Sequence, residues 1–205
     1  MRVAVVDYGS GNLTSVTGAL RHLGVEPVLS SDPSVLSSAE KIILPGVGAF
    51  GDCIRNLRQT GLDRFLEQVK DKVPILGICV GAQMMCRESD EFGRHEGLGW
   101  VDAVVRRLEM APDQSDLRVP HVGWNELHRT RDCPLFVDVP DDALFYYVHS
   151  YAMQPCMADL AVATCDYGSR FMASFQAGMV YGVQFHPEKS QQHGLTVLKN
   201  FVERG

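Results

Sequence analysis

The sequence predicts an α/β fold: a central, mostly parallel sheet with helices on both faces and added antiparallel strands. Two observations predict this class. The first half of the chain alternates short Val/Ile/Leu runs with segments of helical spacing, which is the pattern of βαβ units around a parallel sheet. From Trp100 onward the chain changes to short β-rich runs with turn residues between them. Residues 1–205 contain no linker, repeat or low-complexity segment, and we expect them to form one domain.

The first half of the chain supplies the predicted parallel strands and the helices between them. Helical spacing in residues 13–23 predicts a helix that Gly24 ends, and helical spacing in residues 53–69 is interrupted by Gly61. The predicted strands cover residues 3–7, 27–30, 41–46 and 73–78. Their continuous Val/Ile/Leu runs indicate strands that are buried on both faces.

The β-rich part of the chain predicts antiparallel strands that are added to the core sheet. Four runs carry this pattern: residues 100–110, 144–153, 158–165 and 178–185. The last segment, residues 193–204, predicts a helix that packs back onto the protein through Leu195, Leu198 and Phe201.

Charge and hydropathy argue against two classes of partner. The chain has 25 acidic and 19 basic residues, a net charge of −6, and the charges are spread evenly, which does not fit a nucleic-acid surface. The apolar run at the N-terminus is too short for a membrane span and lacks a signal-peptide cleavage pattern. We therefore expect a cytoplasmic protein without nucleic-acid or membrane partners.

The cysteines of the chain indicate reduced thiols rather than a structural metal site. They form no C-x-x-C pair and no tight Cys/His cluster, and they are Cys53, Cys79, Cys86, Cys133, Cys156 and Cys165. Five of them are expected to behave as small buried hydrophobic residues, with Cys79 as the exception. A metal site built from His121, His128 and Cys133 lacks the required ligand spacing, so we expect no metal.

The first glycine-rich turn, "DYGSGNLT", follows a predicted strand and opens a predicted helix, as a dinucleotide-binding motif does. The fit is poor. Thr14 occupies the third glycine position of G-x-G-x-x-G, and only Asp32 stands loosely where an acidic residue would bind ribose. A tight turn or a loop that faces a partner explains the same residues.

A second glycine-rich turn surrounds one of the cysteines. In "GICVG", Cys79 stands between a predicted strand and a helix start, with Gly77 and Gly81 two residues away on either side. This is the context of a nucleophile elbow, in which a sharp turn lifts the side chain clear of the sheet and a helix N-terminus favours the thiolate. A buried core cysteine in a strand-to-helix turn explains the motif equally well when it is taken alone.

The segment "YGVQFHPEKS" adds a candidate base and a group that orients it. His186 follows an apolar strand, and Glu188 lies two residues later across Pro187, which restrains the chain between them. A histidine that faces a thiol needs an acceptor for its other N–H, and Glu188 can be that acceptor. Each residue alone is explained as an ordinary surface residue, but with Cys79 they match a nucleophile, a base and an orienting carboxylate.

The loop "LPGVGAF", residues 44–50, follows another strand of the same predicted sheet. The carboxyl ends of neighbouring parallel strands share one crevice, so we expect this loop beside Cys79. The backbone N–H groups of Val47 and Val80 are then candidates for an oxyanion hole. The alternative for the glycines of this loop is a tight turn.

These motifs resemble those of the class I glutamine amidotransferases. "LPGVGAF" resembles their oxyanion motif, "LGICVGAQ" their nucleophile motif and "QFHPEKS" their His/Glu motif. The segments "DYGSGNL", "PHVGWNEL" and "FYYVHSYA" extend the resemblance over essentially the whole chain and narrow it to the glutaminase subunits of imidazole glycerol phosphate synthases. The resemblance implies a flavodoxin-like fold, no cofactor, and hydrolysis of L-glutamine to glutamate and ammonia for a separate cyclase subunit in histidine biosynthesis.

The resemblance also implies roles for individual residues. Cys79 would attack the carboxamide of glutamine, His186 would transfer protons, and Glu188 would orient His186. The residues implied in holding glutamine are Gly48, Gln83, Glu91, Ser150 and Tyr151, and those implied in facing the cyclase are Asn12, Trp124, Tyr146 and Lys189.

Two rival interpretations stay open. Another cysteine hydrolase of the same architecture, such as a γ-glutamyl hydrolase or a stress-related hydrolase, would share the nucleophile turn, although "HPE" and "PHVGWN" argue against it. A binding module that kept the fold and lost turnover would also match, but it would have no need of an intact Cys79, His186 and Glu188.

Overall fold

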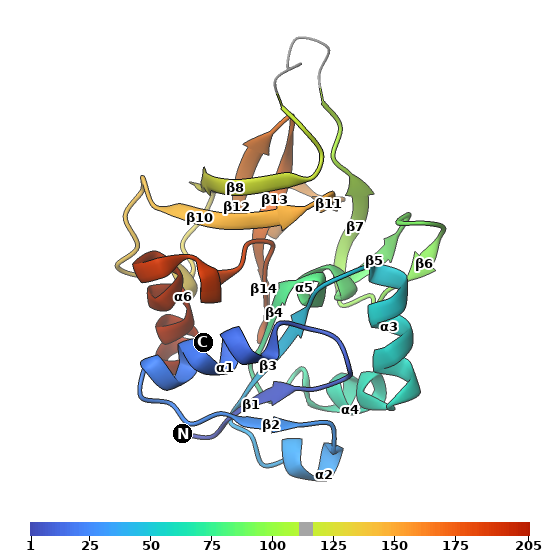
Figure 1. Ribbon diagram of the computed structural model, residues 1–205, viewed down its shortest axis with the longest axis vertical. Coiled ribbons are helices and arrows are strands. Elements are labelled where there is room, and N and C mark those ends of the chain that lie inside the picture. The colour runs from blue at the N-terminus through green and yellow to red at the C-terminus, as the bar shows by residue number, and fades with distance from the viewer. Residues whose placement is uncertain (111–116) are drawn as a thin grey trace.

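The computed structural model describes residues 1–110 and 117–205, and Figure 1 shows its elements. The helices are α1 (Leu13–His22), α2 (Pro33–Leu36), α3 (Phe50–Gln59), α4 (Leu62–Val69), α5 (Val80–Met84) and α6 (Gln191–Arg204), with 3₁₀ turns η1 (Pro134–Phe136), η2 (Ala158–Leu160) and η3 (Pro187–Lys189). The strands are β1 (Val3–Val6), β2 (Val28–Ser30), β3 (Lys41–Gly46), β4 (Ile75–Cys79), β5 (Cys86–Ser89), β6 (His95–Glu96), β7 (Val101–Arg107), β8 (His121–Glu126), β9 (His128–Arg129), β10 (Leu144–His149), β11 (Tyr151–Pro155), β12 (Ala161–Tyr167), β13 (Ser169–Ala177) and β14 (Val180–Val183).

The central sheet confirms the predicted fold class. Its core has the order β2-β1-β3-β4-β14, and each neighbouring pair in this series is parallel. The sheet continues from β14 through β13, β11, β7, β5 and β6, with antiparallel pairing at every step except between β7 and β5. β14 joins the two parts, because it is parallel to β4 on one side and antiparallel to β13 on the other.

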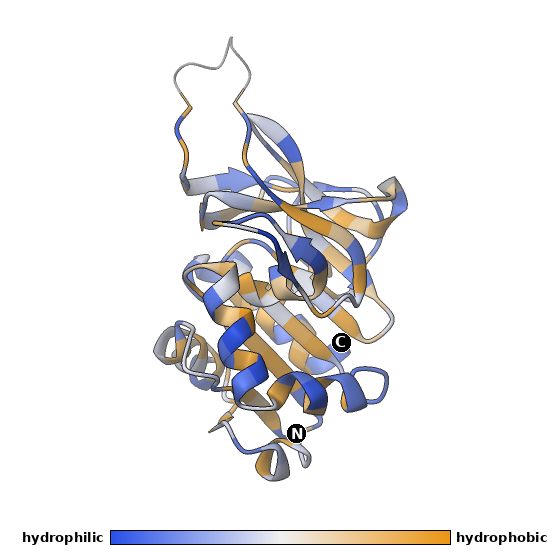
Figure 2. Cartoon of the chain, turned by 90° about the vertical axis from the view of Figure 1, so that its right-hand side faces the viewer, coloured by the Kyte–Doolittle hydropathy of each residue, from blue (hydrophilic) through white to orange (hydrophobic). Residues whose placement is uncertain are grey.

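The parallel strands are buried because their side chains are apolar on both faces. Every residue of β1, β4 and β14 is buried. Figure 1 shows α1 and α6 on one side of these strands and α3 and α4 on the other. In Figure 2 the orange, apolar strands of this half lie behind helices with blue outer faces. The amphipathic helices therefore cover the sheet with their apolar stripes.

The helices lie close to their predicted positions. α1 ends at His22, shortly before Gly24, and Gly61 adopts a left-handed φ of 72° where α3 gives way to α4. α6 packs through Leu198 and Phe201, which are fully buried, while Leu195 is partly buried against the same core. Across the described part of the chain, the helices all lack the length or the apolarity that a membrane span requires.

The prediction that residues 144–153 add to the core sheet is wrong for most of that run. β10 pairs with β8 in a separate two-stranded antiparallel sheet, and only β11 joins the core sheet, so the chain changes sheet at Ser150. Neither β8 nor the nine-residue β13 was predicted. β13 is buried at five consecutive positions and so lacks the apolar–polar alternation that marks a half-buried strand.

The carboxyl ends of β3, β4 and β14 lie side by side, since these strands are parallel neighbours. Gly46 is paired with Cys79 in the sheet, and Val183 is paired with Ile78. The loop after β3, helix α5 and the segment after β14 therefore all start at one edge of the sheet.

Candidate active site

The turn from β4 into α5 holds Cys79 in a strained backbone conformation. Its φ is 53° and its ψ is −114°, values that residues other than glycine rarely adopt. A Cβ at Gly81 would lie 1.9 Å from the carbonyl oxygen of Leu44, and one at Gly77 would lie 2.6 Å from the Cα of Ala82. Close backbone contacts therefore require both glycines of "GICVG".

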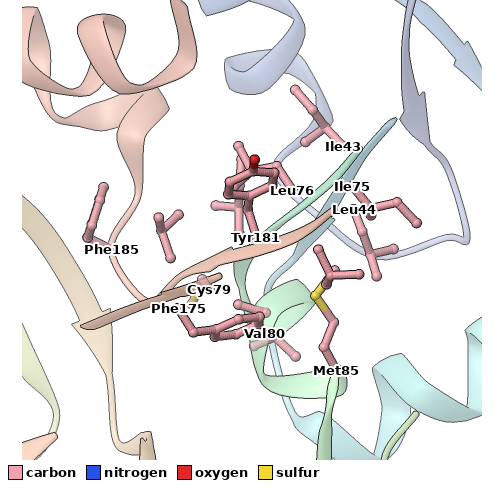
Figure 3. Close-up of a cluster of buried hydrophobic side chains, with 14 of the residues drawn as sticks. Ile43, Leu44, Ile75, Leu76, Cys79, Val80, Met85, Phe175, Tyr181 and Phe185 are labelled. Carbon is pink, nitrogen blue, oxygen red and sulfur yellow. The ribbon is translucent and has the colours of Figure 1, made fainter. Parts of the chain in front are cut away.

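The sulfur of Cys79 meets a cavity rather than open solvent. Cys79 is only 3% exposed, and Figure 3 shows it with Val80 in a cluster of buried side chains where β4 runs into α5. The cavity has a volume of about 470 Å³ and is lined by Gly11, Asn12, Val47, Gly48, Cys79, Val80, Gln83, Glu91, Val148, His149, Ser150, Tyr151, His186 and Lys189. A larger hollow beside η1, of about 920 Å³, has no histidine in its lining.

The segment after β14 brings His186 and Glu188 together. Nδ1 of His186 lies 2.8 Å from Oε1 of Glu188 in the protein interior. The carboxylate accepts, so Nδ1 carries the proton and Nε2 is the nitrogen left for chemistry. Nε2 is buried and has no hydrogen-bond partner within residues 1–110 and 117–205. The backbone N–H of His186 donates to the carbonyl of Tyr146, which ties this segment to β10.

Cys79 and Glu188 control the protonation of His186. Burial by itself lowers the pKa of this imidazole, but its attraction to the Cys79 sulfur and to the Glu188 carboxylate outweighs burial and raises the pKa to about 10. The ring is therefore protonated when the sulfur is ionised, as in an activated cysteine–histidine pair. The sulfur and Nε2 lie outside hydrogen-bond geometry, a spacing that is common between a nucleophile and its base before substrate arrives.

Helix α5 begins directly after Cys79 and has five residues, little more than one turn. Protonated His186 supplies a positive charge beside the sulfur. The favourable effect of the helix N-terminus on the thiolate stays a prediction.

The loop after β3 packs against the nucleophile turn. Val47 and Gly48 line the same cavity as Cys79, and Gly48 has a left-handed φ of 96°. A Cβ at Gly46 would lie 2.5 Å from the backbone nitrogen of Gly81, so only glycine permits this approach. The loop and the turn are thus close enough for backbone groups of both to face one substrate atom.

Two buried side chains hold this loop in place. The hydroxyl of Tyr8 donates to the carbonyl of Pro45 over 2.8 Å, and the thiol of Cys53 donates to the carbonyl of Val47 over 3.3 Å. Tyr8 belongs to the first glycine-rich turn, whose Gly11 also lines the cavity. This placement favours the loop interpretation of that turn over the dinucleotide interpretation. Asp32 instead caps α2 by accepting from the backbone N–H of Ser34.

The residues predicted to hold glutamine all line the cavity: Gly48, Gln83, Glu91, Ser150 and Tyr151. The amide nitrogen of Gln83 donates to the carbonyl of Tyr151 over 2.9 Å and to Oε1 of Gln184 over 3.1 Å. Oε2 of Glu91 accepts from the backbone N–H of Phe50 at the start of α3, and burial raises the pKa of Glu91. The nearby Glu88 instead pairs with two arginines, Arg94 and Arg106.

Two polar groups of the site were not predicted. Nε2 of Gln184 lies 3.8 Å from the sulfur of Cys79, and His149 lines the cavity. The available signal was adjacency in the sequence, because Gln184 stands two residues before His186 and His149 directly precedes Ser150.

The residues predicted to face a partner line the cavity or extend from it. Asn12 and Lys189 are lining residues. Nζ of Lys189 lies 5.8 Å from the ring centroid of Tyr146, and the rings of Tyr146 and Trp124 are 5.9 Å apart at 68°. Trp124 is 43% exposed. The four side chains therefore lead from the cavity to the outer face of the β8–β10 sheet.

The three residues considered for a metal site lie apart. His121 bonds to His149 in the interior, and His128 lies at the surface beside Asp166. Cys133 borders the hollow beside η1.

Comparison with known proteins decides the family. Residues 4–204 match the family model described as "Glutamine amidotransferase class-I". The chain belongs to this family. The match confirms the family predicted from the motifs, and the cavity beside Cys79 is the candidate active site of a class-I glutamine amidotransferase.

Individual relatives narrow the comparison. A protein of Geobacter sulfurreducens named "Imidazole glycerol phosphate synthase subunit HisH" is 45% identical over 205 residues, which cover 98% of each chain. A protein of the same name from Acinetobacter baylyi is 41% identical over 203 residues, again 98% of each chain. The solved structure of PurLQS from Thermotoga maritima has a TM-score of 0.74 at 20% identity and covers 98% of this chain and 97% of that chain, which shows the fold.

Proposed function

We propose that this chain is the glutaminase subunit of an imidazole glycerol phosphate synthase, which hydrolyses L-glutamine to glutamate and ammonia in histidine biosynthesis. The observation that carries the proposal is the meeting of Cys79 and His186 in one cavity, with Glu188 bonded to the far nitrogen of His186. The relatives named HisH, at 41% and 45% identity over almost the whole chain, support the pathway. We place this biosynthetic role in the cytoplasm.

The first half of the reaction forms a thioester. The thiolate of Cys79 attacks the carbon of the substrate carboxamide, and negative charge moves to the carboxamide oxygen. The backbone N–H groups of Val47 and Val80 bind this oxygen, and losing one such donor typically costs about 3 to 4 kcal/mol of transition-state stabilisation. The proton on Nε2 of His186 passes to the departing nitrogen, the C–N bond breaks, and ammonia leaves.

The second half hydrolyses the thioester. Neutral His186 takes a proton from water, the resulting hydroxide attacks the thioester carbon, and a second oxyanion forms on the same oxygen. The C–S bond then breaks, which releases glutamate and returns the thiolate of Cys79. Glu188 keeps its bond to Nδ1 of His186 throughout, so Nε2 moves the protons in both halves.

Glutamine is recognised through its charged α-amino and α-carboxylate groups. Glu91 supplies the negative charge for the ammonium, and its Oε1 is available because the backbone N–H of Phe50 takes Oε2. Both hydrogens of the Gln83 amide are used inside the protein, so Gln83 offers its oxygen to the substrate. The backbone at Gly48, Ser150 and Tyr151 completes the site by binding the α-carboxylate.

A cyclase subunit docks, in this proposal, on the outer face of the β8–β10 sheet. Val122 is paired with Val148 and Trp124 with Tyr146, so these side chains share one face. Val122 is 56% exposed and Val148 is 37% exposed, and contiguous exposed apolar side chains favour a protein partner. Val148 also lines the cavity, so a partner on this face covers it and receives ammonia away from bulk water.

Mixing the chain with a cyclase subunit tests the proposal. We expect imidazole glycerol phosphate to form from glutamine with the wild-type chain and not with Cys79→Ser. When ammonium chloride replaces glutamine, product should form with the wild-type chain and with Cys79→Ser, because free ammonia bypasses the glutaminase step. Product that forms only from ammonium with the wild-type chain would contradict the proposal. Glutamate release without any transfer to the cyclase would indicate a different glutaminase of the same family.

A further inference from the structure

A pair of buried histidines, one of which lines the cavity, lies beside Ser150 and Tyr151. His121 of β8 and His149 of β10 are 2% and 7% exposed and form one end of the two-stranded register. Nδ1 of His121 lies 3.1 Å from Nε2 of His149, and Nδ1 of His149 lies 2.9 Å from the carbonyl oxygen of Tyr151. The ring of His121 stacks on Tyr147 and on Tyr167, with centroids 4.8 Å and 3.8 Å apart, which fixes its plane.

These contacts determine which nitrogen carries the proton on each ring. A backbone carbonyl only accepts, so Nδ1 of His149 donates to Tyr151. Burial lowers the pKa of His149 to about 3 and that of His121 to about 4, so both rings are neutral at pH 7. Nε2 of His149 is then a bare acceptor, and Nδ1 of His121 donates to it. The hydrogen bonds run in one direction, from His121 through His149 to the Tyr151 carbonyl.

The Tyr151 carbonyl is shared between His149 and Gln83. The amide nitrogen of Gln83 donates to this oxygen and to Oε1 of Gln184, so both of its hydrogens are used. A carboxamide has two orientations of nearly the same shape, and only the one seen here leaves the Gln83 oxygen for the cavity. Nε2 of Gln184 continues the chain of contacts to the sulfur of Cys79.

We propose that His149, held by His121, is a positioning residue for glutamine recognition. Its hydrogen bond fixes the Tyr151 backbone and, through the shared carbonyl, keeps the carboxamide of Gln83 turned with its oxygen toward the substrate. This inference rests on the proposed glutaminase function. It adds two histidines that the reaction itself does not use.

Steady-state kinetics test the proposal. His149→Phe keeps a ring of similar size and removes the donor to Tyr151. We expect its KM for glutamine to rise about three- to tenfold and its kcat to change less than about twofold, because an uncharged hydrogen bond that serves binding is lost while Cys79 and His186 are untouched. His121→Phe keeps the ring that stacks on its neighbours and should raise KM by a smaller factor.

A matched control and a measurement without mutation complete the test. Tyr147→Phe alters the same aromatic cluster, and its KM should not change, since the Tyr147 hydroxyl is buried with no hydrogen-bond partner in the described residues. Long-range ¹H–¹⁵N NMR of the wild-type rings should show His121 and His149 as neutral Nδ1–H tautomers at pH 7.

Three results would overturn the positioning role. They are an unchanged KM in His149→Phe, an equal rise of KM in Tyr147→Phe, and a proton on Nε2 of His149. A wild-type chain that hydrolyses no glutamine would overturn the proposed function as well, whereas normal wild-type turnover with any of the three results overturns the positioning role alone.

Discussion

Nδ1 of His186 lies 2.8 Å from Oε1 of Glu188, and both side chains are only 1% exposed. The second oxygen of Glu188 is buried and has no hydrogen-bond partner among the residues that the structure describes. The imidazole is therefore the group that this carboxylate serves. Glu188 therefore fixes the tautomer of His186, and together with the larger attraction of the Cys79 sulfur it stabilises the protonated ring.

Glu188→Gln keeps the size of the side chain and an acceptor oxygen but removes the negative charge. We expect kcat for glutamate release to fall about 10²- to 10⁴-fold with little change in KM, because the amide no longer holds the protonated imidazole. The pKa of His186 should fall in the same variant. Glu203→Gln, an exposed carboxylate on α6, is the control and should match the wild type. Turnover of Glu188→Gln within twofold of the wild type would show that Glu188 does not orient the base.

The proposed triad of Cys79, His186 and Glu188 could be predicted because each member has a local signal at the end of a strand. Cys79 stands in a glycine-flanked turn, His186 and Glu188 follow an apolar strand, and the ends of parallel strands meet at one edge of a sheet. Those signals can be recognised in short stretches of sequence, and the parallel topology then places the three residues at the same edge of the sheet.

The second half of the chain was harder to predict because its contacts are decided by tertiary packing. His121 and His149 are 28 residues apart, and nothing local fixes the register that brings their rings together. The contact between Gln184 and the sulfur of Cys79 depends in the same way on side-chain conformations, which a sequence pattern does not encode. The strong local signals therefore identify the proposed catalytic residues, whereas the residues packed around them depend on tertiary contacts.

The glycine at position 81 should be indispensable to the fold. A Cβ at this position would lie 1.9 Å from the carbonyl oxygen of Leu44. Gly81→Ala therefore has to displace the backbone of β3 or of the turn that holds Cys79. We expect a loss of about 3 kcal/mol or more in the free energy of unfolding, measured by urea denaturation. Gly18→Ala is the matched control: it lies exposed on α1, meets no atom within 4 Å, and should stabilise the protein by about 0.5 to 1 kcal/mol. Equal stability of the two variants would contradict the packing argument.

The proposed docking face predicts a variant that loses the partner and keeps the chemistry. Val122→Glu puts a charge in the middle of the apolar face, where burial against a cyclase subunit would desolvate it. We expect the Kd for the cyclase to rise at least about tenfold, while glutamate release without the cyclase is unchanged. Leu29→Glu is the control, because Leu29 is also exposed, at 46%, but lies on edge strand β2. Calorimetric titration checks both, and equal affinities would exclude this face.

The carboxylate of Glu91 predicts that kcat/KM for glutamine decreases at acidic pH. Burial raises the pKa of Glu91 above its ordinary value, and only the ionised form attracts an ammonium group. As the pH falls through this raised pKa, kcat/KM for glutamine should therefore fall. Glu91→Gln should raise KM about tenfold or more at pH 7 and remove this decrease, since a hydrogen bond to a charged group is lost. Glu96→Gln, an exposed neighbour on β6, should keep the wild-type profile, and a shared profile for both variants would exclude Glu91.

The buried histidines should make the stability of the fold depend on pH. The pKa values of His121 and His149 fall from 6.5 to about 4 and about 3 on folding. Between pH 6.5 and 4 the unfolded chain binds more protons than the folded chain, so the free energy of unfolding decreases as the pH is lowered through this window. Each histidine contributes up to about 1.4 kcal/mol per pH unit. His186 acts at higher pH, because its raised pKa gives stability that is complete below pH 6.5 and is lost as the pH rises from 6.5 toward about 10.

Urea unfolding at pH 7, 6 and 5 measures this slope. We expect the double variant His121→Phe/His149→Phe to lose less stability than the wild type between pH 7 and 5, because neither phenylalanine takes up a proton when the chain unfolds. His22→Gln, which removes an exposed histidine on α1, is the control for the loss of a histidine. The wild type and the two variants have the same carboxylates, so the contribution of the carboxylates to the pH dependence of stability cancels in the comparison. If the double variant kept the wild-type slope, the two rings would take up protons equally in the folded and the unfolded chain, which would contradict the one-way chain of hydrogen bonds to Tyr151.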